Sequence, residues 1–321
     1  MKIAVFSNLN AGGGRSAAAL EKMRGAWRGH ELFGVSGFGG ESLPACIRPE
    51  LPEGAYLPRL NAAVQALLDE KPDLLVTVGG DGAAAYAADR VIRAGSRVPM
   101  LGIGAGTANV GPIVSFTAES LPDPESLEET CLGAVEVLDA EGRHTAFGFN
   151  DVVIGNTFLG TSPEGETKTY SAGALAGRGV LEEAASLSEI FAEGGQMSLN
   201  GEPLDPLPFP AAQMIVSPVA PDRFYGRAYA GLLCYTPGSP YQAAAYVSPH
   251  PAVSMEEDDA GFSSWRPGAQ LLLSEADFLR LDHLRSDVCA VADGNPYLLP
   301  EGSVTLHYVP DLIRVLKRSG L

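Results

Sequence analysis

The chain has 321 residues, of which 45% are hydrophobic and 19% are charged, and this length and composition predict a globular protein of about two domains. Its formal net charge is −17. Because no basic face is apparent, nucleic acid and an anionic membrane surface are both disfavoured as partners. No apolar run approaches the ~18 residues that a membrane-spanning helix needs. These features leave a small-molecule substrate as the expected partner.

The cysteines and the first residues indicate the compartment. Cys46, Cys131, Cys234 and Cys289 are far apart and form no CxxC pair, which is typical of reduced thiols in a cytosolic protein. Residues 1–8 read as a first strand and lack the cleavage site of a signal peptide. We therefore expect a cytoplasmic protein, and we expect it to assemble as a homo-oligomer.

Residues 1–140 alternate between strand and helix patterns. Short apolar runs predict strands, and apolar residues three or four positions apart predict helices. The expected strands are 2–6, 74–78 and 98–103, and the expected helices are 17–27, 62–68 with Asn61 as its cap, 83–94 and 126–138. This alternation predicts an α/β domain with a doubly wound, mostly parallel sheet. Ligands of such sheets bind beyond the carboxyl ends of the strands.

The pattern changes after Arg143, where short strands are separated by proline and glycine. The expected elements are strands at 144–154, 213–218, 228–235, 243–247 and 270–274, one helix at 181–191, and an acidic loop at 251–265. Residues 141–295 are therefore predicted to form a mainly β domain for the substrate or another interaction. Residues 296–321 contain a further apolar stretch, which we expect to return to the first domain.

The most informative segment is the strand at 74–78 with the Gly79, Gly80, Asp81 and Gly82 that follow it. Glycines between a strand and a helix let the backbone approach a phosphate closely, because they carry no Cβ. The start of the helix directs free N–H groups at the same point. The Asp81 carboxylate beside such a cradle favours Mg²⁺-nucleotide chemistry, or a base that deprotonates an alcohol. The alternative is that Asp81 only caps the helix.

Two further glycine turns follow predicted strands. They contribute the remaining candidate nucleotide-binding residues of this domain, which are Asn8, Gly12 and Gly13 in one turn and Gly104, Gly106, Thr107 and Asn109 in the other. A single turn of this kind can need glycine for its geometry alone. Three such turns at the ends of three strands predict a shared phosphate cradle for a Mg²⁺-bound nucleotide.

In their order along the chain, the segment 8–15, the GGDG at 79–82 and the GIGAGTAN at 102–109 resemble the NAD kinase/diacylglycerol kinase superfamily. The chain is most similar to the ATP-NAD kinase branch, including its AcoX-type members. The resemblance implies the NAD kinase-like fold of an α/β domain and a mainly β domain. It also implies a kinase that transfers a phosphoryl group from ATP to a hydroxyl of NAD, giving NADP, or of a related soluble acceptor, with Asp81 as the catalytic residue.

The second domain adds three candidate site residues. Asn150 and Asp151 offer donor and acceptor groups to a ribose or another polyol, and they resemble the Asn-acidic pair of NAD kinases. Asp293, followed by Gly294 and Asn295, resembles the DGQ or DGE segment of the superfamily, and its hard carboxylate oxygens suit a phosphate-bound metal. The structural alternatives are a strand-end turn for Asn150 and Asp151, and a β-turn for Asp293.

Two other functions stay open at this point. A lipid kinase of the diacylglycerol type is disfavoured by the acidic net charge, by Val110 where lipid kinases usually carry Asp, and by Asn295 in place of the acidic residue of their DGE. A nucleotide-binding sensor without catalysis is kept open, because residues 161–173 are only a loose echo of the TPTGSTAY loop of NAD kinases. Asp81 counts against a sensor, since a pure binding protein has less need of a carboxylate beside phosphates.

Overall fold

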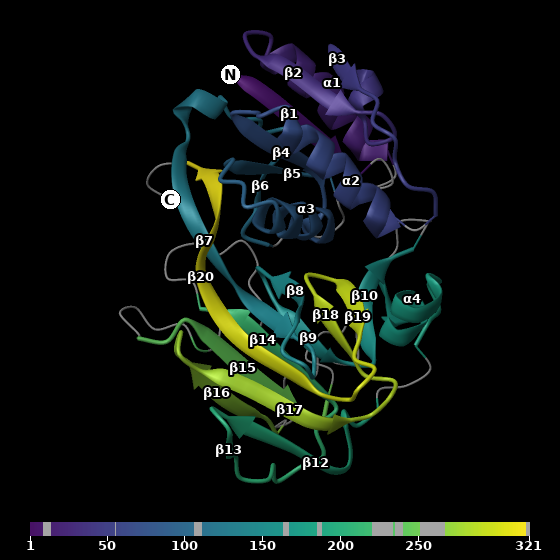
Figure 1. Cartoon of the computed structure of the whole chain (residues 1–321), viewed down its shortest axis with the longest axis vertical. Coiled ribbons are helices and arrows are strands. Elements are labelled where there is room, and N and C mark those ends of the chain that lie inside the picture. Colours follow the sequence, from purple (N-terminus) through teal and green to yellow (C-terminus); the bar gives the residue numbers. More distant parts are fainter. Residues whose placement is uncertain are drawn as a thin grey trace. The chain divides into compact units, whose positions relative to one another are not determined.

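A computed structural model of the chain describes residues 1–8, 14–54, 56–105, 111–162, 167–184, 188–219, 234, 240–250 and 267–318 (Figure 1). The chain forms two compact units. Unit 1 comprises Met1–Leu132 and Asp311–Leu321, and unit 2 comprises Gly133–Pro310. The boundaries fall inside two long strands, β7 (Glu128–Leu138) and β20 (Val304–Lys317), so each of these strands contributes residues to both units.

Unit 1 is built on a parallel sheet. Its strands are β1 (Lys2–Ser7), β2 (Glu31–Val35), β3 (Ala45–Ile47), β4 (Leu74–Gly79), β5 (Met100–Gly104) and β6 (Val114–Thr117). They pair in the order β6-β5-β4-β1-β2-β3, and each of these pairs is parallel. Near the end of β20, Val315 also pairs in parallel with Met100 of β5. The carboxyl ends of β1, β4 and β5 therefore meet at one edge of the sheet, where open α/β sheets bind ligands.

Helices cover both faces of this sheet. They are α1 (Arg15–Ala26), α2 (Tyr56–Asp69) and α3 (Asp81–Arg93). Leu20 of α1 packs into one buried cluster with Ile3 and Val5 of β1. Ala4 and Phe6, which point to the opposite face because side chains alternate along a strand, are also fully buried. α2 and α3 contact each other and the sheet. The sheet is thus buried on both sides, as a parallel sheet requires.

Unit 2 is mainly antiparallel β structure. One sheet has the strand order β16-β15-β14-β9-β18-β19, the unit 2 part of the 12-stranded sheet runs β8-β7-β20-β17-β12-β13, and β10 pairs with β11. The bounds are β8 (His144–Gly148), β9 (Val152–Gly155), β10 (Thr157–Thr161), β11 (Thr167–Ser171), α4 (Ala172–Arg178), β12 (Phe191–Leu199), β13 (Glu202–Pro203), β14 (Gln213–Pro218), β15 (Ala243–Ser248), β16 (Ala269–Leu273), β17 (Phe278–Leu284), β18 (Cys289–Ala292) and β19 (Asn295–Leu298).

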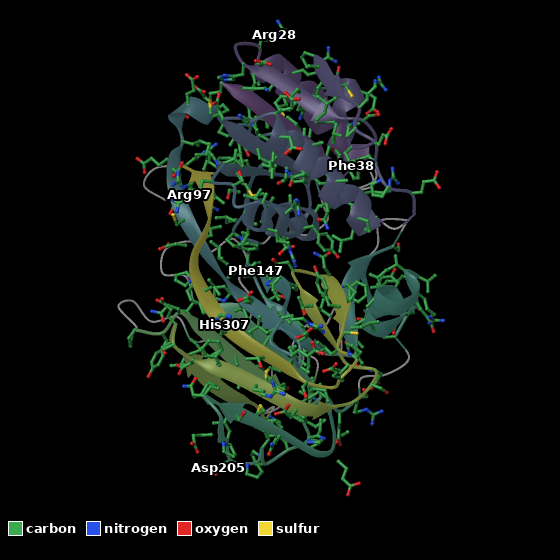
Figure 2. The ribbon with its side chains drawn as sticks, in the orientation of Figure 1. Arg28, Phe38, Arg97, Phe147, Asp205 and His307 are labelled. Carbon is green, nitrogen blue, oxygen red and sulfur yellow. The ribbon has the colours of Figure 1, made fainter. Side chains whose placement is uncertain are left out.

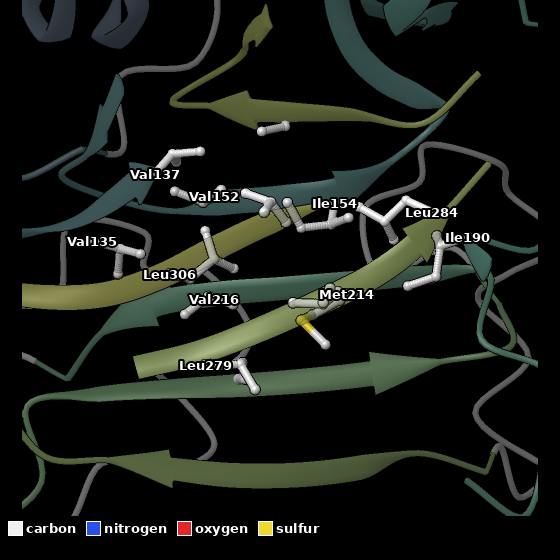
Figure 3. Close-up of a cluster of buried hydrophobic side chains, with 14 of the residues drawn as sticks. Val135, Val137, Val152, Ile154, Ile190, Met214, Val216, Leu279, Leu284 and Leu306 are labelled. Atoms are coloured by element: carbon white, nitrogen blue, oxygen red, sulfur yellow. The ribbon is translucent and has the colours of Figure 1, made fainter. Parts of the chain in front are cut away.

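The main core of unit 2 joins these two sheets (Figure 3). Val135 and Val137 of β7 and Leu306 of β20 belong to the same buried cluster as Val152 and Ile154 of β9. The cluster therefore takes side chains from both sheets, and it fixes β9 and the loop that precedes it. That loop carries two of the candidate site residues.

The predicted fold class is confirmed. The structure has an α/β unit with a mostly parallel sheet and a mainly antiparallel unit, as the patterns indicated. The strand expected at 213–218 is β14, and those expected at 2–6, 74–78, 243–247 and 270–274 are observed within one residue at each end. No helix among the described residues has both the length and the apolar composition needed to cross a membrane. The four cysteines, all in described positions, are free thiols.

Two of the predicted helices are wrong. Residues 128–138 form strand β7, preceded by the short 3₁₀ turn η3 (Pro124–Ser126). Here Val135 and Val137 alternate onto the core, and pairing with β8 and β20 holds the segment extended. Residues 181–184 and 188–190, the described part of the second predicted helix, are not helical, and β12 already begins at Phe191. A helix that the sequence analysis did not predict, α4, lies just before this region.

Other boundaries also differ. α2 begins at Tyr56, so Asn61 lies inside the helix and does not cap it. The strand predicted at 144–154 is interrupted at 149–151 and forms β8 and β9. Apart from Cys234, the strand predicted at 228–235 lies outside the described residues, as does the acidic loop at 251–265.

Candidate active site

Asp81 is the first residue of α3, directly after the turn that ends β4. Gly79 is the last residue of β4, and Gly80 is the N-cap of α3 with φ −99° and ψ 179°. Gly80 therefore occupies the capping position, and Asp81 lies in the first helical turn with Gly82 behind it. The positive end of the helix dipole stabilises a carboxylate in this turn.

The segment after the third glycine turn lies against Asp81. A Cβ atom at Gly111 would be 2.9 Å from Oδ1 of Asp81 and 3.0 Å from its Cγ. Only glycine fits at this approach without displacing the carboxylate. On the β5 side, Gly79 pairs with Gly104, and the N–H of Ala105 donates to the carbonyl of Gly79 at 2.8 Å. The second and third glycine turns thus leave the sheet side by side.

Asn8, at the start of the first glycine turn, lies beside the end of β4. Its backbone N–H donates to the carbonyl of Val78 at 2.9 Å, and the Ser16 hydroxyl donates to the Asn8 carbonyl at 2.8 Å. A Cβ atom at Gly79 would lie 3.4 Å from the Cβ of Asn8. Residues of all three turns therefore gather at one edge of the unit 1 sheet.

Several predicted site residues lie outside the described part of the chain. They are Gly12, Gly13, Gly106, Thr107 and Asn109. The described residues on either side of them, Asn8 and Gly14 in one case and Ala105 and Gly111 in the other, bracket the two segments. Their part in binding phosphate stays a prediction.

A fourth glycine turn at the end of β2 was missed by the sequence analysis. Gly37 and Gly39 have φ values of 80° and 87°, in the left-handed region that favours glycine. Between them Phe38, labelled in Figure 2, is buried, and its carbonyl accepts the Ser7 N–H at 3.0 Å. The signal that would have revealed this turn is the SGFGG segment at 36–40, which follows the apolar run at 32–35. Gly111 is a second missed residue, and no local signal separates it from an ordinary loop glycine.

In unit 2 the structure brings Asn150, Asp151 and Asp293 together. The Asn150 Nδ2 donates to Oδ2 of Asp151 at 2.9 Å. Asp293 accepts three backbone N–H groups, from Phe149 at 2.8 Å, from Asn150 at 2.8 Å and from Asp151 at 3.1 Å. Its own N–H donates to the carbonyl of Asp151 at 3.0 Å. The predicted pair and the predicted turn are therefore one hydrogen-bonded cluster.

The charge state of this cluster is set by opposing effects. Burial, followed by the neighbouring Asp151 carboxylate, raises the pKa of the Asp293 carboxyl, whereas the three backbone N–H groups act to lower it. Because the Asp151 charge acts on Asp293, the two carboxyl groups disfavour simultaneous ionisation. The cluster therefore offers hydrogen-bond acceptors and, when one carboxyl is protonated, a donor as well. Such a set of groups suits hydroxyl groups of a ligand.

The donor chemistry around Asp81 fits a nucleotide-bound magnesium ion. Among the described residues, no group of three or more His, Cys, Asp or Glu side chains is arranged to hold a metal by itself. Mg²⁺ does not need such a group, because it is commonly bound by one or two carboxylates together with substrate phosphates and water. Asp81 at a helix N-terminus is one suitable carboxylate. The metal-orienting role predicted for Asp293 stays a prediction.

Comparison with known proteins supports the fold. Solved structures share it over nearly the whole chain. A yeast NADH kinase complexed with NADH has a TM-score of 0.52 and 11% identity, covering 98% of this chain and 82% of its own. A putative diacylglycerol kinase from Bacillus anthracis str. Sterne has a TM-score of 0.57 and 12% identity, covering 100% and 98%. No family model and no curated protein matches the sequence. At these identities the likeness shows the fold alone, and the chemistry is inferred from the residues of the site.

Proposed function

We propose that the protein is an ATP- and Mg²⁺-dependent kinase that transfers a phosphoryl group to a hydroxyl of NAD or of a related soluble acceptor. The observation that carries this proposal is the position of Asp81. Its carboxylate lies in the first turn of α3, at the edge of the sheet where glycine turns converge, and Gly111 packs directly against it. A phosphate cradle with one built-in carboxylate suits phosphoryl transfer to an alcohol.

In the proposed reaction the backbone and Asp81 have separate tasks. N–H groups of 79–82 and of the first turn of α3 bind phosphate oxygens. Asp81 orients the acceptor hydroxyl and accepts its proton as the new O–P bond forms and the bond from the γ-phosphorus to the departing ADP breaks. Because an ordinary aspartate is a weak base, most of the acceleration comes from positioning and from electrostatic stabilisation. Bound Mg²⁺ supplies neutralisation of the charge on the phosphates.

The proposed identity of the acceptor rests on two residues of unit 2. Asn150 and Asp151 present an amide and a carboxylate that are already hydrogen-bonded to each other, a preorganised arrangement that suits the hydroxyls of a ribose. The shared fold includes both an NADH kinase and putative diacylglycerol kinases, so it supports a kinase without choosing the acceptor. The net charge of −17 favours a soluble acceptor over a lipid in an anionic membrane.

The test is ATP consumption with Mg²⁺ across NAD, NADH, small polyols and diacylglycerol, for the wild type and Asp81→Asn. The substitution keeps the size of the side chain and removes its charge. It is expected to lower kcat by ~10²-fold or more, the usual worth of a positioned base, while ATP affinity changes little. Asp89→Asn is the matched control, because Asp89 lies on the same helix in an ion pair with Arg93 at 2.7 Å.

The possible results are distinct. Near-full activity of Asp81→Asn would leave Asp81 with a structural role and remove the catalytic assignment. Transfer to diacylglycerol alone would establish the lipid kinase instead. A wild-type protein that binds ATP or NAD and phosphorylates none of these acceptors would be a sensor.

A further inference from the structure

Asp293 occupies a turn whose conformation is unusual for an aspartate. It follows β18 and precedes β19, with Ala292 paired to Asn295 across the turn. Asp293 has φ 47° and Gly294 has φ 80°. Two central residues with positive φ define the tight hairpin turn for which Asp-Gly is a favoured sequence. The β-turn given above as the structural alternative for Asp293 is therefore present. It explains the backbone conformation of Asp293 but not the contacts of its side chain.

The side chain has a second task, because it binds three consecutive peptide N–H groups. Oδ1 accepts those of Asn150 and Asp151, and Oδ2 accepts that of Phe149, all at 2.8–3.1 Å. Successive N–H groups of this kind form a concave anion-binding nest, here filled by the protein's own carboxylate. With 9% of its surface exposed, Asp293 directs its oxygens at the backbone.

The bound segment is the interruption between β8 and β9, where the chain must change direction. A Cβ atom at Gly148 would lie 2.4 Å from the carbonyl of Asp151, so the turn closes tightly. Peptide N–H groups in such a break need partners other than a strand ladder, and Asp293 supplies them for all three residues. The directions of the Asn150 and Asp151 side chains follow from this backbone conformation.

We infer that Asp293 is a positioning residue that holds the 149–151 backbone so that Asn150 and Asp151 present their polar groups to the acceptor hydroxyls. In this role it acts through the peptide groups and does not ligate a metal. The acceptor part of the inference rests on the proposed function, whereas the backbone part does not.

The test compares Asp293→Asn and Asp293→Ala with Asp287→Asn as a matched control. Asp287 is a nearby exposed carboxylate in an ion pair with Arg285 at 3.2 Å. Amide hydrogen exchange measured by NMR reports the backbone directly. We expect exchange at 149–151 to accelerate about tenfold or more in Asp293→Ala, the effect of losing ~1.4 kcal/mol of local hydrogen bonding. In Asp293→Asn, whose amide keeps one acceptor oxygen, we expect the change chiefly at Phe149.

Steady-state kinetics add a measurement that a general loss of stability would not give. We expect KM for the acceptor to rise about tenfold in Asp293→Asn, with KM for ATP within about twofold of the wild type. Unchanged exchange at 149–151 in both variants would overturn the inference. So would a loss of Mn²⁺ binding by Asp293→Asn with exchange unchanged, because that would make Asp293 a metal ligand. Should the protein prove inactive on every acceptor, the exchange result still decides the backbone role.

Discussion

Packing requires glycine at Gly102, whereas no backbone strain requires it at Gly80. A Cβ atom at Gly102 would lie 2.6 Å from the carbonyl oxygen of Ile113 and 2.6 Å from the Cα of Val114, so Gly102 is required by the packing of β5 on β6. Gly80 has φ −99° and ψ 179°, an extended conformation that any residue adopts. Backbone strain therefore does not require glycine at this position, and the phosphate cradle proposed above gives a reason for it.

Substitution of Gly80 tests this explanation. Gly80→Val is expected to weaken ATP binding by roughly tenfold or more, a cost of ~1.4 kcal/mol, because the isopropyl group would crowd the phosphate. The thermal midpoint should stay close to that of the wild type, since the backbone conformation is retained. Isothermal titration with Mg-ATP measures the affinity. The control is Gly29→Val, at an exposed position with open space around it. Equal affinities in the two variants would rule out a phosphate cradle at Gly80.

At the scale of elements, local signals were predictive and long-range ones were not. The GGDG turn was identified because a buried strand, glycines and a helix follow one another within a few residues. The helical spacing of Leu127, Cys131 and Leu138 predicts a helix over 126–138. The structure has strand β7 there, because pairing with β8 and β20 sets its conformation. Pairing partners distant in the sequence override local propensity.

α4 was missed for the opposite reason, since it is too short to show periodicity. It has 7 residues, fewer than the 10–12 over which a helical pattern becomes distinct. A usable signal was nevertheless present at its start. The Ser171 hydroxyl accepts the N–H of Ala174 at 3.3 Å, the contact of a serine N-cap.

Lys317, the last residue of β20, is hydrogen-bonded to the segment that follows the third glycine turn. Lys317 is 4% exposed, which is rare for a lysine. Its ammonium group donates to the carbonyl of Pro112 and to the hydroxyl of Ser115. Pro112 directly follows Gly111, which packs against Asp81. Strand β20 thus stabilises the backbone on which the approach of Gly111 depends.

Loss of the Lys317 ammonium should therefore destabilise the protein. Lys317→Met keeps the apolar stem but leaves a partly buried carbonyl and a hydroxyl without their charged donor. We expect the free energy of unfolding to fall by about 1–3 kcal/mol, measured by urea denaturation. Arg318→Met is the control, because the next side chain is exposed and lies over the Phe116 ring at 5.5 Å. A loss of equal size in the control would show that the general charge of the chain end matters, and not the Lys317 contacts.

For the whole molecule, the sequence was sufficient for the fold class and insufficient for contacts between distant segments. The fold is shared at 11–13% identity over nearly the whole chain, so overall similarity says little about chemistry and the order of the glycine turns says more. The hydrogen bond from the Phe149 N–H to the Asp293 carboxyl joins residues 144 positions apart. No spacing rule predicts such a contact, because it depends on the pairing of β18 with β9.

The response of the whole molecule to acid depends on a partly buried carboxylate, that of Glu136. Glu136 of β7 is hydrogen-bonded to two imidazoles, to Nδ1 of His144 at 2.6 Å and to Nε2 of His307 at 2.7 Å. Burial raises the pKa of Glu136, but the hydrogen bonds and charges of the two histidines outweigh it and lower that pKa from 4.5 to about 2. Glu136 therefore links three strands of unit 2 in a way that depends on its ionisation.

The sign of the effect follows from linkage. A carboxyl whose pKa is lower in the folded than in the unfolded chain stabilises the fold fully above about pH 4.5 and loses that contribution as the pH falls to about 2. The shift corresponds to at most roughly 3 kcal/mol. Glu136→Gln should therefore be less stable than the wild type at pH 7, and the difference should shrink through this window. Urea unfolding at pH 7, 4.5, 3 and 2 measures this difference.

The control is Glu129→Gln, on the same strand. Glu129 forms an exposed ion pair with Arg314 at 3.1 Å, so its substitution should change stability by less than about 1 kcal/mol at pH 7. A difference for Glu136→Gln that persisted at pH 2 would mean that packing, and not ionisation, accounts for the loss.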